Sequence, residues 1–127
     1  MANKFTVQAS IICDDVRVED NRKQILIGVY GGDFILNKIP ATLTFCFWIE
    51  LVARERGNHP LEFSIQVPGT EERVEAGASI NDPSEPTILI FRTTLLIQKT
   101  GEFKLSMREG KAKWRTLSVR PGGLRVI

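Results

Sequence analysis

The chain has 127 residues, 43% of them hydrophobic and 25% charged, with a formal net charge of +2 at pH 7. These ordinary values exclude disordered, collagen-like and membrane-spanning classes, and they predict a single domain over residues 1–127 that folds without disulfides. The longest uncharged run, residues 39–49, is too short to span a bilayer, and the first five residues lack the apolar segment of a signal peptide. We therefore expect a cytoplasmic protein without membrane contact.

Apolar residues alternate with polar neighbours along much of the first half of the chain, which is the pattern of half-buried β-strands. We expect strands over residues 5–13 and 25–29, joined by a polar turn or connection at residues 14–22. A short strand at residues 33–36 follows a glycine turn. Residues 43–51 are apolar on both faces, which predicts a central strand covered on both sides.

The second half continues the pattern. Residues 61–67 and 74–80 are predicted to pair, the latter as an edge strand or at a crowded position. Residues 88–97 are predicted to be buried on two faces or to contain a bulge that switches the inward-facing side. Residues 103–107 form a hairpin with residues 112–119, after which the tail is released at Arg120. His59 is expected to be solvated in a polar loop.

No window shows the 3.6-residue apolar period of a helix. The fold class is therefore predicted to be all-β, an antiparallel β-sandwich of about eight strands with the general architecture of immunoglobulin domains. A Greek-key barrel is the alternative. Cys13 and Cys46 lie in apolar runs, and we expect both to be buried and reduced.

The densest group of charges follows the first strand. Residues 13–19 read Cys-Asp-Asp-Val-Arg-Val-Glu, and Lys23 and Leu-Ile-Gly-Val-Tyr at residues 26–30 follow. This string resembles the N-terminal signature of an uncharacterised family of small bacterial and phage-associated β-rich domains. The resemblance covers residues 10–30, and it implies a bacterial or phage origin and a β-rich fold, without an assigned activity.

The same group suggests two roles for its side chains. Carboxylates at Asp14, Asp15, Glu19 and Asp20 could gather Ca²⁺ or Mg²⁺, and a metal-dependent activity would centre on Asp14, Asp15, Arg17, Glu19 and Lys23. The spacing matches no known metal loop, so we expect no metal site. We expect instead that Arg17 pairs with an acid across the strand, while Asp14 or Asp15 caps backbone N–H groups.

The C-terminal hairpin carries the second candidate surface. Lys111, Lys113 and Arg115 flank Trp114, and strand alternation would project the three bases from one face. Phosphates and a stacked base would fit such a surface, so residues 104–115 predict nucleic-acid binding as an alternative function. The competing interpretation is a solvated edge hairpin whose lysines prevent strand pairing.

Charge is also unevenly distributed along the chain. Residues 50–85 contain eight acids and three bases, a balance of −5, whereas residues 104–127 contain seven bases and one acid, a balance of +6. Complementary segments of this kind favour association with a protein partner or a second copy. The sequence has no catalytic motif and no cofactor fingerprint. We therefore predict a non-enzymatic binding or assembly module that acts through protein–protein contacts.

Overall fold

The computed structural model describes residues 4–127, and this part of the chain contains nine strands and no helix. None of the described residues forms a helix long and apolar enough to cross a membrane. The strands are β1 (Phe5–Val18), β2 (Gln24–Val29), β3 (Phe34–Leu36), β4 (Ala41–Ala53), β5 (Gly57–Val67), β6 (Thr70–Ile80), β7 (Thr87–Ile97), β8 (Gly101–Glu109) and β9 (Arg115–Val126).

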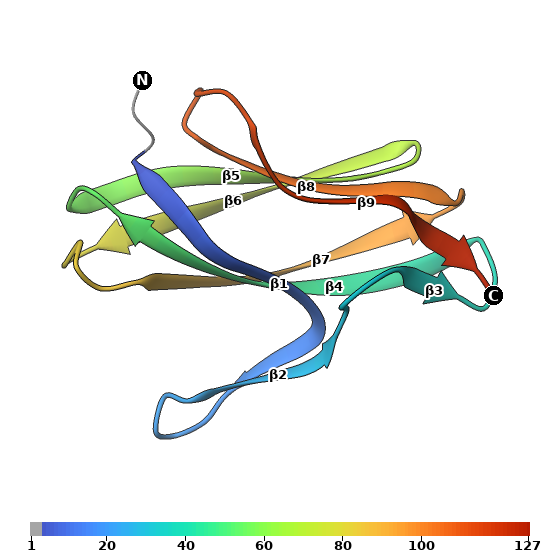
Figure 1. Ribbon diagram of the computed structural model, residues 1–127, viewed down its shortest axis with the longest axis horizontal. Helices are drawn as coiled ribbons and strands as arrows, with labels where there is room; N and C mark the ends of the chain where they lie inside the picture. The colour runs from blue at the N-terminus through green and yellow to red at the C-terminus, as the bar shows by residue number, and fades with distance from the viewer. Residues whose placement is uncertain (1–3) are drawn as a thin grey trace.

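The strands form two packed sheets, which Figure 1 shows one above the other. Sheet A has the order β2-β1-β4-β7, and sheet B has the order β3-β9-β8-β5-β6. The predicted all-β sandwich is thus confirmed, with nine strands in the described residues instead of about eight. One pair departs from the antiparallel prediction, because β3 runs parallel to β9. The finer likeness to immunoglobulin domains stays a prediction.

Alternating side chains of both sheets fill the space between them. On β4, Phe45, Phe47 and Ile49 are fully buried and face the core, and on β5 Phe63 and Ile65 meet them from the other sheet. Burying one such side chain stabilises the fold by about 1.5–3 kcal/mol relative to leaving it exposed. Because apolar residues recur at every second position, each strand has an apolar face. The packing of these faces between the two sheets produces the sandwich.

The prediction that residues 43–51 form a central strand is confirmed, because β4 lies between β1 and β7. Its outer face carries Cys46, which is fully buried, and Trp48, which is partly buried. Cys13 lies directly opposite Cys46 in the β1–β4 ladder, and both are free thiols without solvent exposure. The prediction of two buried, reduced cysteines is also confirmed.

Two predicted boundaries are wrong because polar composition hid continuing strands. Residues 14–18 are not a turn but the end of β1, and Val16 is buried there. The chain is not released at Arg120, because β9 continues to Val126 and pairs with β3. In both cases the backbone N–H and C=O groups bond to a second strand, whereas in a solvated connection they would bond to water.

The remaining strands are predicted with mixed success. Strand β6 is an edge of sheet B and pairs with β5, as expected. Strand β7 is the other edge of sheet A; residues 88–91 are partly buried on both faces, since Leu89 and Phe91 pack on the core and Ile90 packs on the outer cluster, whereas burial alternates from Thr93 onward. The predicted β8–β9 hairpin forms, and its register shifts between Gly101 and Phe103 and again between Leu105 and Ser106.

Candidate functional site

The first candidate surface is an arm formed by residues 14–29, the C-terminal part of β1 and the whole of β2. The β1–β4 ladder ends at the pair Cys13 and Cys46, and beyond it β1 pairs only with β2. Figure 1 shows the arm below sheet A, on the side away from sheet B. Val16 and Leu26 of the arm pack against Cys46 and Trp48, so the arm covers the outer face of β4.

Hydrogen bonds fix the arm to sheet A at separate points. The indole Nε1 of Trp48 donates to Oε1 of Gln24 at 2.5 Å. The guanidinium of Arg92, on β7, donates to Oδ1 of Asp15 at 2.7 Å and to the carbonyl oxygen of Val16 at 3.1 Å. These contacts link the arm to two strands of the sheet, and they leave its outer surface free.

The structure gives each predicted charged residue of the arm a different environment. Asp15 lies 2.7 Å from Arg92 and 3.7 Å from Arg17, and the hydrogen bond from Arg92 lowers the pKa of its carboxyl group. Asp14 accepts a hydrogen bond of 2.7 Å from the hydroxyl of Tyr30. Burial, followed by this contact with Asp14, raises the pKa of Tyr30 to about 12.

The roles predicted for these residues are only partly correct. Arg17 does meet an acid, but Asp15 lies on the same strand and its shorter ion pair is with Arg92. The carboxylates of Asp14 and Asp15 accept hydrogen bonds from the side chains of Tyr30 and Arg92, and a backbone hydrogen bond from Val16 also lowers the pKa of Asp15. Glu19 and Lys23 close the turn of the arm through a backbone hydrogen bond of 2.8 Å. Within residues 4–127, no three His, Cys, Asp or Glu side chains converge as metal ligands would.

The outer side of β2 is apolar and lies beside the charged side chains of Arg17 and Asp15 on β1, which are opposite Ile25 and Ile27 in the register. Ile25, Ile27 and Val29 alternate along β2 and are 42%, 38% and 54% exposed. Strand β2 is also the free edge of sheet A, so its backbone is paired on one side only in the described chain. An exposed apolar edge of this kind is a template for pairing with another strand. Sequence reasoning identified the strand but not that it lies at an edge.

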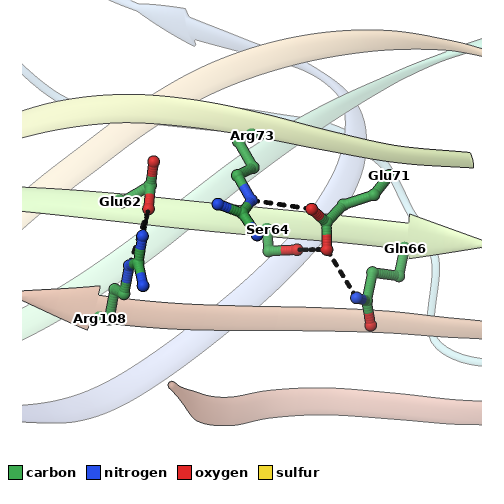
Figure 2. A network of polar contacts seen from close by, with 6 residues as sticks. All are labelled: Glu62, Ser64, Gln66, Glu71, Arg73 and Arg108. Carbon is green, nitrogen blue, oxygen red and sulfur yellow. Dashed lines mark hydrogen bonds and ion pairs between the residues drawn. The ribbon is translucent and has the colours of Figure 1, made fainter. Parts of the chain in front are cut away.

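The second candidate surface, the basic C-terminal hairpin, adjoins the outer face of sheet B through Trp114. Figure 2 shows the polar contacts of this face. The carboxylate of Glu71 accepts hydrogen bonds from Ser64 at 3.1 Å, from Gln66 at 2.7 Å and from Arg73 at 2.8 Å. These donors, Gln66 first, lower the pKa of Glu71. All the named donors are used within the sheet, so the network fixes the side chains of this face in place.

Trp114 joins this network through two arginines. The Cζ atom of Arg108 lies 4.3 Å from the ring centroid and that of Arg73 lies 5.4 Å away, within range of cation–π contact. Arg108 also forms an ion pair with Glu62, at 2.6 Å. The arginines that hold Trp114 are therefore already paired with acids of the same sheet.

The basic hairpin does not present its cations on one face. Lys111 and Lys113 are exposed in the segment between β8 and β9, where strand alternation does not apply. Arg115 is on β9 and donates a hydrogen bond of 2.9 Å to the carbonyl oxygen of Phe5, on sheet A. The predicted common face of Lys111, Lys113 and Arg115 is therefore wrong.

His59 was expected in solvent and is instead buried on β5. Its Nδ1 lies 2.9 Å from the carboxylate of Glu109, and its Nε2 lies 3.0 Å from the carbonyl oxygen of Glu55. The hydrogen bond with Glu109 raises the pKa of the imidazole. The polar residues around it suggested a loop, and the partner that buries it is 50 positions away in sequence.

Comparisons with known proteins add no relative to this description. No protein-family model matches the chain, and no curated protein does either.

Proposed function

We propose that the protein is a non-enzymatic assembly module that associates with a second copy of itself through the free edge of β2. The observation that carries this proposal is the row of exposed apolar side chains at Ile25, Ile27 and Val29 on an unpaired strand edge. Pairing with another strand would satisfy the free backbone groups and remove these side chains from water together.

Two of the devices that natural proteins use to prevent such pairing, charged side chains and proline, are absent from β2. The arm behind it is fixed to sheet A by the contacts of Trp48 and Arg92, so little ordering is needed when a partner strand adds to it.

A second copy fits this edge because an antiparallel pair of identical strands is self-complementary under two-fold symmetry. Centred on Ile27, such a pair sets Ile25 of each copy opposite Val29 of the other. The arm carries four acids and three bases, a balance of −1, so repulsion between two copies is weak. The acids are Asp14, Asp15, Glu19 and Asp20, and the bases are Arg17, Arg22 and Lys23.

Sedimentation velocity at rising protein concentration tests the proposal. We expect the native chain to form dimers at micromolar concentration, and Ile27→Lys to weaken association by about tenfold or more because it places a charge in the apolar contact. Val119→Lys is the matched control, since Val119 is 43% exposed on sheet B, away from the arm. The Val119→Lys variant should dimerise with the same affinity as the native chain.

Hydrogen exchange locates the contact. Dimer formation should protect those backbone amides of residues 24–29 that do not already bond to β1, while Ile27→Lys, with an otherwise native exchange pattern, should leave these amides unprotected. A native chain that stays monomeric up to high micromolar concentration contradicts the proposal, and so does equal dimerisation of both lysine variants.

A further inference from the structure

A cleft separates the two sheets where β1 and β9 begin. Up to Cys13, β1 pairs only with β4, and residues 115–120 of β9 pair only with β8, so both strand edges are open there within the described chain. The cleft has a volume of about 490 Å³, and Thr6, Arg54, Arg115 and Thr116 contribute to its lining. It is far larger than a single phosphate or carboxylate group requires.

Arg115 bridges the cleft and has an unused donor. Its Nη1 donates to the carbonyl oxygen of Phe5 at 2.9 Å, which fixes the guanidinium between the two sheets. Its Nη2 is buried and has no hydrogen-bond partner among the described residues. Leaving a buried donor unsatisfied is unfavourable, and more so when the group is charged. An acceptor from outside the chain would remove this penalty once a small movement of the Arg115 side chain exposes Nη2 to the cleft.

The charges around the cleft leave an excess of cations. Lys4 is paired with Glu55 at 3.7 Å, and His59 is paired with Glu109 at 2.9 Å, so both nearby acids are already in use. Across residues 4–127, no ion pair involves Arg54 or Arg115.

We propose that this cleft binds an oxyanion, a carboxylate or a phosphate group, between the guanidinium groups of Arg54 and Arg115. Guanidinium groups match the geometry of such anions and form charge-assisted hydrogen bonds with them. The hydroxyl of Thr116, which also lines the cleft, is a further donor. The site is independent of the β2 edge, which belongs to the arm on the outer side of sheet A.

Titration of the ¹⁵N-labelled protein with inorganic phosphate, and separately with acetate, tests the inference at low ionic strength. We expect saturable changes in NMR signals confined to residues 5–7, Arg54 and residues 115–117. The anion that saturates at the lower concentration identifies phosphate or carboxylate as the preferred ligand chemistry.

Variants separate a built site from a general charge effect. Arg54→Gln should weaken binding by about tenfold or more, as expected for loss of a charged hydrogen bond. Lys99→Gln is the matched control, because it removes the same charge from the exposed turn between β7 and β8 at the opposite end of the sandwich, and its affinity should stay native.

Arg115→Lys keeps the charge but loses the planar fork, so it should also weaken binding while the amide spectrum remains that of the folded protein. The inference is overturned if neither anion gives a saturable change at millimolar concentration. It is equally overturned if Arg54→Gln and Lys99→Gln lower the affinity to the same extent, since this would show attraction by net charge alone.

Discussion

At the scale of single residues, His59 is a buried ionisable group with a hydrogen-bond partner for each ring nitrogen. The side chain is only 6% exposed, and the edge of its ring packs on Phe5 with 4.9 Å between ring centroids. Both ring nitrogens face oxygen acceptors, on Glu109 and Glu55. Only the imidazolium form donates from both nitrogens, so the fold favours the protonated histidine. This raises its pKa, chiefly through Glu109.

The raised pKa of His59 gives a prediction about pH. A group whose pKa is higher in the folded state stabilises the fold fully below its unfolded pKa, about 6.5 for histidine, and this stabilisation is lost as pH rises through the folded pKa. We therefore expect the free energy of urea unfolding to fall as the pH rises above about 6.5 and through the raised folded pKa of His59. Cys13 and Tyr30, with pKa values raised to about 11 and about 12, titrate above this window.

Glu109→Gln is the matched variant for this measurement. It should lower the unfolding free energy near pH 6 by about 1–2 kcal/mol, because the imidazolium loses its carboxylate partner. The unfolding free energy of this variant should also decrease less toward high pH than that of the native chain. Equal slopes for the native chain and Glu109→Gln would contradict the assigned role of the pair.

At the scale of elements, the arm shows where local sequence information ends. Alternation predicted β2, and the polar residues before it predicted a turn, but residues 14–18 satisfy their polar groups by distant contacts. Arg92 reaches Asp15 across 77 positions, and Trp48 reaches Gln24 across 24. The candidate charges could therefore be identified from the sequence, whereas their partners, and the free edge of β2, depend on how the strands are ordered in space.

Gly28 provides a prediction for the arm. Its φ of +68° lies in the left-handed region, and a Cβ atom there would lie 2.2 Å from Oδ2 of Asp14. Gly28→Ala should therefore destabilise the protein by at least about 1–2 kcal/mol from backbone strain alone. It should also raise hydrogen exchange in residues 14–29, since the displaced Asp14 loses its contact with Tyr30.

Gly31→Ala is the control for the arm, because an added Cβ at Gly31 would meet no atom within 4 Å and the backbone there is not in the left-handed region. Its unfolding free energy should stay within about 0.5 kcal/mol of the native value. Equal stability of the two alanine variants would show that Gly28 is not required for the conformation of the arm.

At the scale of the whole molecule, the charge pattern and the apolar pattern of the sequence contribute differently to the proposed association. The acidic segment, residues 50–85, contains β5 and β6, and the basic segment contains β9 and most of β8; β5 and β8 are neighbours in sheet B. Glu62 and Arg108 meet there, so part of the complementarity that suggested association is used within one chain. The association that we propose through β2 rests instead on apolar surface.

The sandwich itself could be predicted because apolar alternation is a local property of each strand. The order of strands in each sheet could not, since β1 and β4, or β5 and β8, are brought together only by long-range packing. The same limit explains the parallel pairing of β3 with β9, which joins the middle of the chain to its end. A three-residue strand carries too little pattern to predict its partner.

Phe45 connects the two sheets at the centre of an aromatic cluster, and this provides the final prediction. Its ring centroid lies 4.9 Å from that of Phe34 on β3 and 5.5 Å from that of Phe103 on β8, both in sheet B. Phe45→Ala should lower the unfolding free energy by about 3–5 kcal/mol, because the cavity would span the interface between the sheets. The total free energy of unfolding of a typical domain is only about 5–15 kcal/mol.

Leu96→Ala is the control for Phe45→Ala, since Leu96 is 49% exposed on β7 and should lose no more than about 0.5 kcal/mol. Urea unfolding followed by circular dichroism measures both variants. If Phe45→Ala cost as little as Leu96→Ala, the two sheets could not be held together by the packing of their inner faces, and the alternation of apolar residues would need another explanation.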